Sequence, residues 1–296
     1  MKILIAGGSG LIGTALSKAL VANGHQVVVL TRNPAGKKES AHISYAAWNP
    51  AQLEIDQQAV ESADAIVNLA GANVAQRWTS AAKREIMDSR VNSTRTLVNA
   101  LQNAPSKTLI NASAIGIYPF GDEPSNEASP LGEGFLQDVV KAWEIEGQKA
   151  AEQHRVAFIR IGLVLSNDGG AMAKLLPVFK MGLGSAVGSG KQWQSWIHID
   201  DLVNLFIRSI EDDAINGVIN GVASHPVTNQ QFSKALAASL SKGFWAPKVP
   251  AFVLKLIFGE MSQVILRSQK VVSTVQDSFN FQCAYPTIDK ALNELS

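Results

Sequence analysis

The amino-acid sequence predicts an α/β fold, in which a doubly wound parallel sheet carries a smaller, mostly helical C-terminal lobe. Three observations lead to this prediction. Short apolar segments alternate with segments of helical period through the first half of the chain. A glycine-rich loop directly follows the first apolar segment. From about Gly169 onward, glycines interrupt the alternation and later segments have a helical pattern.

Six short, β-rich segments bounded by turn residues are expected to form the sheet. They are almost wholly apolar, which suits parallel strands buried on both faces. The predicted strands are Lys2–Ala6, Gln26–Thr31, Ile43–Ala47, Ala65–Leu69, Lys107–Ala112 and Ala157–Leu165.

Segments of helical period separate the first strands. Apolar residues recur at helical spacing from Leu11 to Leu20, and Asn23-Gly24 supplies a stop signal. A second, longer helix is expected to begin after Thr79. Strand and helix alternation of this kind predicts βαβ units.

The later part of the chain predicts a helical lobe. Glycines divide residues 169–190 into loops around a short helix near Met172–Met181. A helix follows Asp200, which is well placed as its N-cap. Another follows Thr228, where Thr228 and Gln231 have the spacing of a capping box. The last stretch of the chain is also predicted to be mainly helical.

Composition and charge exclude several classes of protein. Of 296 residues, 46% are hydrophobic and 17% charged, which is typical of a packed globular chain and excludes extensive disorder. The formal net charge of +1 gives no electrostatic signature of binding to nucleic acid or to an anionic membrane. Apolar runs are too short to span a membrane, and the N-terminus reaches glycine too early for a signal peptide. The single cysteine, Cys283, cannot form an intrachain disulfide or a four-ligand zinc site, so we expect no metal and a reducing, cytoplasmic location.

The loop Gly7-Gly8-Ser9-Gly10-Leu11-Ile12-Gly13 lies between the first strand and the first helix. Its spacing is typical of the Rossmann-type dinucleotide site, where glycines allow a tight turn, approach of a pyrophosphate and close packing of helix on strand. The positive end of the helix then faces the phosphates. We expect cofactor contacts from Gly7, Ser9, Gly10, Leu11, Ile12 and Gly13.

The end of the second strand favours NADP(H) over NAD(H). An acidic residue in this region would bind the adenosine ribose hydroxyls of NAD, but the first acidic residue of the chain is Glu39. Arg32 ends the strand, and Lys37 and Lys38 follow it. A guanidinium here can bind the 2′-phosphate of NADP through charge-assisted hydrogen bonds. Further along, Leu69-Ala70-Gly71 ends another strand with small residues that let the backbone approach the cofactor.

Together these features resemble the short-chain dehydrogenase/reductase superfamily, in its extended branch of nucleotide-sugar epimerases and dehydratases. Further segments are similar to an atypical group, the bacterial sugar-nucleotide epimerase-like family described as "epimerase family protein". These segments are Arg77-Trp78-Thr79, Arg160-Ile161-Gly162-Leu163-Val164-Leu165, and Gln192-Trp193 through Asp201. Residues from Val249-Pro250-Ala251 to Tyr285-Pro286 resemble that family's terminal module of unassigned function. The resemblance adds Arg160 to the expected cofactor contacts.

The change of pattern near Gly169, together with the resemblance of the terminal module, predicts two parts of the chain. Residues 1–168 are expected to form the NADP-binding Rossmann domain. Residues 169–296 are expected to form a smaller substrate-side lobe, which includes a C-terminal module of residues 249–296. Long helices on the sheet flank often pair in this superfamily, so a homodimer is also an expectation.

The superfamily uses a tyrosine as acid–base, a lysine four residues later and a serine that binds the reacting oxygen. Ser113 matches the serine, and Lys141 the lysine. Gln137 stands where the tyrosine is expected, and a carboxamide cannot exchange a proton near neutral pH. Tyr118 is therefore the leading substitute, with His198 as a second candidate.

The substrate wall is expected to combine cations with aromatic rings, because arginine suits a phosphate or carboxylate and tryptophan suits a sugar or nucleobase face. The expected substrate residues are Arg77, Trp78, Trp193 and His198, and Arg90 and Trp196 are further candidates for this wall. The leading hypothesis is an NADP-dependent epimerase or oxidoreductase acting on a nucleotide sugar or a similar small polar carbonyl or alcohol. Because the usual tyrosine is missing, the alternative is a redox-silent NADP(H)-binding regulatory or scaffold protein.

Overall fold

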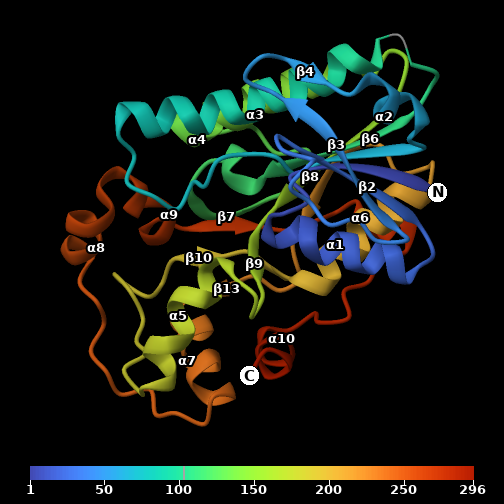
Figure 1. Cartoon of the computed structure of the whole chain (residues 1–296). Coiled ribbons are helices and arrows are strands. Elements are labelled where there is room, and N and C mark those ends of the chain that lie inside the picture. The colour runs from blue at the N-terminus through green and yellow to red at the C-terminus, as the bar shows by residue number, and fades with distance from the viewer. Residues whose placement is uncertain (103) are drawn as a thin grey trace.

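An eight-stranded sheet forms the centre of the computed structural model, which describes residues 1–102 and 104–296 (Figure 1). The strand order is β12-β8-β6-β5-β1-β2-β3-β4, and all neighbours are parallel except β3 and β4. This confirms the predicted α/β class and the doubly wound parallel sheet. The strands are β1 (Lys2–Ala6), β2 (Gln26–Thr31), β3 (Ile43–Asn49), β4 (Glu54–Ile55), β5 (Ala65–Asn68), β6 (Thr108–Ala114), β8 (Arg155–Ile161) and β12 (Gly217–Gly221).

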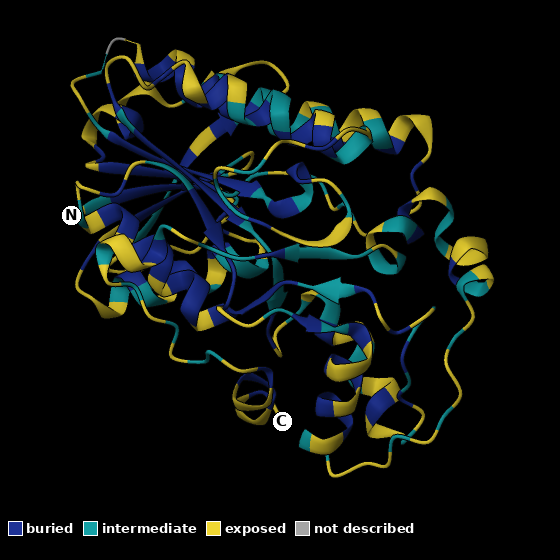
Figure 2. Ribbon diagram, turned by 180° about the vertical axis from the view of Figure 1, so that it is seen from behind, coloured by how far each residue is buried: buried dark blue, intermediate teal, exposed yellow. Residues whose placement is uncertain are grey.

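Helices cover both faces of this sheet (Figure 1). α1 (Leu11–Ala22) and α6 (Ile199–Glu211) pack on one face. α3 (Ser80–Leu101) and α4 (Phe135–Gln148) pack together on the other, which the short α2 (Gln57–Ser62) also covers. Figure 2 shows the strands largely buried, whereas the outward sides of the helices are exposed. Among the described residues, no helix is long and apolar enough to cross a membrane.

Side chains of the central strand β1 alternate between two hydrophobic cores. Ile3 and Ile5 belong to the core that contains Leu16 of α1, whereas Leu4 belongs to the core that contains Leu97 of α3. All of these side chains are fully buried. Successive side chains of a strand point to opposite faces of the sheet. Because both faces are covered by helices, the strand sequences are continuously apolar.

Local signals fix several helix ends as expected. The Thr79 hydroxyl accepts a hydrogen bond from the main-chain N–H of Ala82 at the start of α3. Thr228 and Gln231 form both hydrogen bonds of a capping box at the start of α7 (Asn229–Ser239). These side chains satisfy N–H groups that the first turn of a helix leaves without partners.

Two predicted elements need correction. The expected strand Ala157–Leu165 divides at Gly162, after which β9 (Leu163–Leu165) leaves the main sheet and pairs with β11 (Trp196–His198). A Cβ at Gly162 would lie 2.7 Å from the Ser195 oxygen, so the chain turns where only glycine fits. Asp200 is not the N-cap of α6: that residue is His198, whose Nδ1 accepts from the main-chain N–H of Asp200 at 3.2 Å.

The later part of the chain contributes to both the main sheet and the lobe. β12 is an edge strand of the main sheet and α6 packs on this sheet, although both elements follow residue 168. The lobe has its own hydrophobic core, to which α5 (Gly170–Lys180), α7 and α10 (Ile288–Glu294) contribute. Residues 249–296 also contain α8 (Ala251–Phe258), α9 (Ser262–Leu266) and 3-10 turns, so the C-terminal module is only partly helical.

A second sheet joins the C-terminal module to the rest of the molecule. Its order is β13-β10-β14-β7. β14 (Gln269–Val271) is the module's strand, and it lies between β10 (Trp193–Gln194) and β7 (Gly121–Ser125), with β13 (Val227–Thr228) at the edge. The module is therefore built into the fold rather than attached to it by a linker.

Candidate cofactor and substrate site

The glycine loop between β1 and α1 is closely packed against the end of β5. Gly7 has a φ of +79°, and a Cβ there would lie 2.7 Å from the carbonyl carbon and oxygen of Leu69. A Cβ at Gly13 would collide with the Gly7 oxygen and lie 2.6 Å from the Gly8 Cα. Two of the three motif glycines are thus required by the packing of the loop itself.

The start of α1 fits a bound pyrophosphate. Gly10 is its N-cap, no side chain caps the helix, and its first turn contains no acidic residue. Ser9 and Gly10 are exposed, and with Leu11 they line a surface groove of about 650 Å³ along α1. N–H groups at an uncapped helix start bind anions readily. The loop therefore has the donors and the space that a dinucleotide needs.

Arg32 is exposed just beyond the carboxyl end of β2. β2 is the neighbour of β1, and Leu30 pairs in register with Ala6, the last residue before the glycine loop. Arg32 thus follows the strand beside the loop, at the same edge of the sheet. Contact between Arg32 and a 2′-phosphate stays a prediction.

A cleft with a volume of about 340 Å³ lies at the carboxyl ends of β6 and β8. Residues Ala114–Gly116 and Ile161–Leu163 form its floor, and α4 supplies apolar side chains. Trp193–Ser195 line it from the lobe, and Arg267 with Gln269 line it from the C-terminal module. This is the edge at which open α/β sheets bind ligands.

Few charged groups line the cleft. Its charged groups are two arginines, Arg90 and Arg267. Among the described residues that line it, none is Asp, Glu, His, Lys, Tyr or Cys. In the described part of the chain, no three side chains of the metal-binding types gather as a metal site.

Ser113 is directed away from this cleft. Its side chain faces α4, where the hydroxyl donates to Glu144 Oε1 at 2.5 Å. Asn111, two residues earlier, faces the same side and accepts from Asn68 Nδ2 at 2.8 Å. Because side chains alternate along a strand, Ala114 lies at the cleft instead. The geometry therefore does not fit the predicted contact between Ser113 and a reacting oxygen.

Tyr118 is fully buried, and its hydroxyl already has two partners. It donates to Asn220 Oδ1 and accepts from Arg160 Nη1, each at 2.8 Å. Burial raises the pKa of Tyr118 above its usual range, although Arg160 and Asn220 act in the opposite direction. A phenol that is closed off from the cleft does not fit the predicted acid–base role.

Arg160 belongs to the same buried cluster rather than to a cofactor groove. Its Nε and Nη2 bind Glu144 at 2.8 and 2.7 Å, while Nη1 binds Tyr118. Its register partners on the neighbouring strands are Ser113 on β6 and Asn220 on β12, so one polar row crosses three strands. With its donors engaged inside the protein, Arg160 does not fit the predicted cofactor contact.

Lys141 and Gln137 hold the loop that precedes α4. Lys141 Nζ donates to the Gly132 oxygen at 2.7 Å. Gln137 is buried, and its Nε2 donates to the Tyr118 oxygen at 3.1 Å. Neither side chain lines the cleft among the described residues. The structure thus gives the two positions of the expected tyrosine–lysine pair a role in anchoring the loop.

The four predicted substrate residues have different surroundings. Only Trp193 lines the cleft. Trp78 is buried against Phe135, with ring centroids 5.0 Å apart, and Arg77 is exposed close to Gly259. His198 caps α6 and stacks on Tyr285, with ring centroids 4.0 Å apart. Trp78 and His198 therefore pack the interior rather than forming a substrate wall.

The sequence interpretation assigned the C-terminal module to the substrate-side lobe but did not identify Arg267 or Gln269 as residues of the cleft. Gln269 Nε2 donates to the main-chain oxygens of Ile115 and Tyr118, at 3.0 and 3.3 Å. Arg267 lies over the Phe120 ring, 4.5 Å from its centroid. No local motif marks these residues. Their signal is topological, because only the pairing of β14 with β7 and β10 brings them to the cleft.

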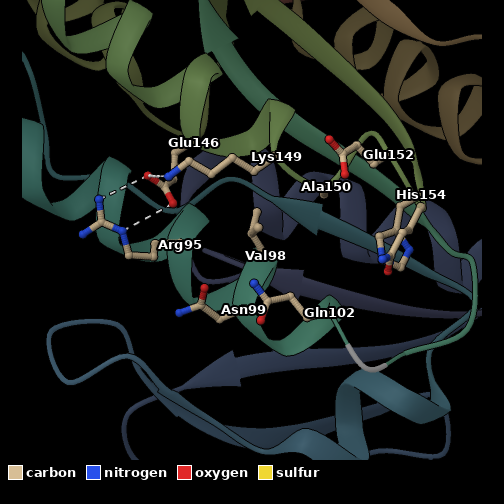
Figure 3. A pocket seen from close by; sticks show the side chains of 10 residues that line it. Arg95, Val98, Asn99, Gln102, Glu146, Lys149, Ala150, Glu152 and His154 are labelled. Carbon is tan, nitrogen blue, oxygen red and sulfur yellow. Dashed lines mark hydrogen bonds and ion pairs between the residues drawn. The ribbon is translucent and has the colours of Figure 1, made fainter.

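A separate pocket lies between the C-terminal ends of α3 and α4 (Figure 3). There Glu146 binds Arg95 Nη2 at 3.1 Å and Lys149 Nζ at 2.9 Å. Burial opposes ionisation of Glu146, but the two cations outweigh it and lower the pKa of this carboxyl. Its central charges are paired with one another. His154 lines the pocket directly before β8 begins, so the pocket lies at the amino edge of the sheet. We therefore assign it no catalytic role.

The sheet order, the glycine loop and the cleft at the carboxyl edge define a Rossmann-type α/β protein. Residues 3–220 match the model of the NAD dependent epimerase/dehydratase family. The chain belongs to this family, which confirms the resemblance seen in its sequence. Residues 249–295 match a second model, described as a domain of unknown function (DUF1731).

Relatives extend over the whole chain. The epimerase family protein SDR39U1 homolog, chloroplastic, of Arabidopsis thaliana is 37% identical over 305 residues, covering 100% of this chain and 86% of that protein. The crystal structure of human epimerase family protein SDR39U1 (isoform2) with NADPH has a TM-score of 0.88 at 31% identity and covers 100% and 99% of the two chains. The nucleoside-diphosphate sugar epimerase from Corynebacterium glutamicum has a TM-score of 0.77 at 31% identity, covering 100% of this chain and 59% of that one.

Proposed function

We propose that this chain is an NADP-dependent epimerase or oxidoreductase that acts on a nucleotide sugar or a similar small polar carbonyl or alcohol. One observation carries this proposal: the glycine loop and the cleft share a continuous edge. Gly7 packs on Leu69, Gly71 packs on the Arg90 guanidinium, and Arg90 lines the cleft. A dinucleotide that follows this edge reaches from α1 to the cleft.

The cofactor contacts come from residues 1–168. N–H groups at the start of α1, from Leu11 to Gly13, would bind the pyrophosphate. Arg32 would bind the 2′-phosphate of NADP, since a guanidinium suits this group and no acidic residue precedes Glu39. The human relative solved with NADPH supports this preference. Bound NADPH would supply a hydride to the substrate carbon.

Residues 169–296 supply the substrate side. The Trp193 indole offers a face for a sugar or nucleobase, and the Gln194 and Gln269 carboxamides can bind hydroxyl groups. Reduction of a carbonyl leaves an oxyanion that must take up a proton. Since the described lining lacks a side chain that exchanges protons near neutral pH, we propose that solvent supplies it. The single Cys283 favours a reducing, cytoplasmic location.

The same lining favours a second candidate, a redox-silent NADP(H)-binding protein that reports cofactor state or positions a partner. Such a protein needs the glycine loop but no proton-transfer group. A homodimer, as expected from the sequence, stays a prediction under both candidates.

One experiment separates the two candidates. Purified protein is titrated with NADPH and NADH by calorimetry, and then incubated with either oxidation state of the cofactor and a panel of UDP-sugars, ketoses and sugar alcohols. Absorbance of the reduced nicotinamide follows redox turnover, and NMR of the sugars detects epimerisation. Tight NADPH binding with turnover supports the enzyme, and tight binding without any turnover supports the redox-silent protein. Equal affinity for NADPH and NADH contradicts the NADP preference.

A further inference from the structure

Two arginines reach the cleft from distant parts of the chain. Arg90 lies on α3, and Arg267 lies in the C-terminal module. Arg90 Nη1 donates to the main-chain oxygens of Ala72 and Ile86, each at 3.1 Å. Arg267 lies over the Phe120 ring. In the described part of the chain, neither guanidinium forms an ion pair with a carboxylate.

Four other arginines of this protein are paired with carboxylates. Each of these four has a carboxylate oxygen within 3.2 Å. This group is Arg95 with Glu146, Arg155 with Asp213, Arg160 with Glu144, and Arg208 with Asp212. Arg32, Arg77, Arg84 and Arg267 also lack such a partner among the described residues, but they are exposed to water. Arg90 is different, because its guanidinium is largely buried at the cleft with no carboxylate beside it.

Burial makes the position of Arg90 costly without a counter-charge. Its guanidinium carbon lies 3.0 Å from the place of a Cβ on Gly71, so the group lies directly against the backbone at the end of β5. Burial lowers the pKa of Arg90 to about 10. A cation taken out of water is stabilised by a negative partner, and the described lining of the cleft contains none. A ligand can supply that partner.

We propose that the substrate carries an oxyanion, a carboxylate or a phosphate, bound in the cleft by Arg90 and Arg267. The inference rests on the proposed function and narrows its substrate class. It also assigns a role to the C-terminal module, which would place one of the two cations that select the substrate.

The structure fixes Arg267 firmly enough for this role. Ser268, the next residue, accepts the main-chain N–H of Gly121 at 2.8 Å, and its hydroxyl accepts the N–H of Trp193 at 2.9 Å. Gln269 then binds the turn after β6. The main chain next to Arg267 is therefore anchored by Gly121 of β7 and by Trp193 of β10, and Trp193 itself lines the cleft. A fixed main chain lowers the conformational freedom that is lost when Arg267 binds an anion.

The test is calorimetric titration with three matched sugars, in the presence and absence of NADPH. The probes are glucose, glucuronate, and glucose phosphorylated at its terminal carbon, which differ in the charge they carry at one position. We compare the unmodified protein with Arg267→Gln and Arg90→Gln. Arg84→Gln is the matched control, because Arg84 is exposed on α3 and does not line the cleft.

We expect at least one anionic sugar to bind about tenfold or more tightly than glucose, and the tighter one identifies the group as carboxylate or phosphate. Arg267→Gln should weaken the affinity for that anionic sugar by about tenfold. This is the lower end of the range for a hydrogen bond to a charged group, and we expect it because Arg267 is exposed. Arg84→Gln should leave the affinity for that anionic sugar unchanged. Glucose should bind with the same affinity to all variants. Arg267→Gln should also retain its affinity for NADPH.

Three equal sugar affinities, or anion binding that is unaffected by Arg267→Gln, would overturn the proposal while leaving the proposed function intact. If the protein binds the anionic sugars through Arg267 but does not bind NADPH, the anion site is supported and the proposed function is wrong. If Arg90→Gln lowers NADPH affinity and leaves anion affinity unchanged, Arg90 belongs to the cofactor and this part of the proposal fails.

Discussion

Arg160 binds Glu144 through two hydrogen bonds, from Nε to Oε1 at 2.8 Å and from Nη2 to Oε2 at 2.7 Å. Both side chains are largely buried, on β8 and α4. Burial alone would lower the pKa of Arg160, but the Glu144 carboxylate more than compensates and raises it. Arg160 thus remains charged in the interior, where its hydrogen bonds with Glu144 hold α4 on the sheet.

Removal of either partner should be strongly destabilising. Arg160→Met leaves the Glu144 carboxylate buried without its cation, a change that costs about 3–5 kcal/mol in buried pairs. Urea denaturation measures the loss in free energy of unfolding. The control is Arg208→Met, which breaks the more exposed pair with Asp212 and should cost less than about 1 kcal/mol. Equal stability of Arg160→Met and the unmodified protein would show that the pair contributes nothing.

Substitution of two motif glycines should distinguish an effect on stability from an effect on cofactor binding. Gly13→Ala places a Cβ against the Gly7 oxygen and the Gly8 Cα, so it should destabilise the fold as well as abolish NADPH binding. At Gly10, the nearest atom to a Cβ is the Gly7 oxygen at 3.3 Å, and the residue is exposed. Gly10→Ala should cost less than about 1 kcal/mol of stability.

At Gly10, however, the added methyl lies where a pyrophosphate would approach α1, so we expect NADPH affinity to fall at least about tenfold. Thermal unfolding and calorimetry of the two variants measure both quantities. If Gly10→Ala binds NADPH as tightly as the unmodified protein, the cofactor does not approach α1 at this residue.

The fold could be predicted because its signals are local. A fully apolar β1 requires two covered faces, and Thr79 and Thr228 mark helix starts through their own side chains. The division of the expected strand at Gly162 could not be predicted in this way. It depends on the approach of Ser195, which lies more than thirty positions along the chain and is brought there by the pairing of β9 with β11.

The candidate catalytic residues show that the position of a residue in a motif does not predict where its side chain points or whether it is buried. Ser113 and Ala114 are neighbours in sequence, but strand alternation directs them to opposite sides, and the alanine reaches the cleft. The partners that bury Tyr118 come from β8 and β12, far along the chain. Such partners are set by tertiary structure, so a phenol near a strand end cannot be recognised from sequence as buried.

Tyr118→Phe should therefore affect stability rather than chemistry. Loss of the hydroxyl leaves Asn220 Oδ1 without its donor and removes one partner of Arg160, which should cost about 1–3 kcal/mol. NADPH affinity and any turnover should stay within about twofold, because the hydroxyl does not reach the cleft. Chemical denaturation, calorimetry and steady-state assays test this together. A large loss of turnover with unchanged stability would restore the acid–base role.

The last prediction concerns the pH dependence of stability through His198. This side chain is buried on β11, and burial lowers its pKa below the usual value, despite opposing effects of Asp200, Asp201 and Glu294. In the unfolded chain the ring titrates near about 6.5. Below that pH the unfolded state binds the extra proton more readily than the folded state, so stability falls as pH decreases. Above it, both states are neutral and the contribution of His198 to the pH dependence vanishes.

The variant His198→Asn should lose less stability than the unmodified protein as the pH decreases. A carboxamide oxygen can still accept the main-chain N–H of Asp200 as a helix cap, but it does not titrate. Urea denaturation at about pH 7.5 and about pH 5.5 should show a smaller loss of stability in His198→Asn than in the unmodified protein. The difference is limited to about 1.4 kcal/mol per pH unit, the value for one proton. His42→Asn is the control, because His42 is exposed and should retain the original slope. If His198→Asn and the unmodified protein lose stability equally on acidification, His198 is not held neutral by burial.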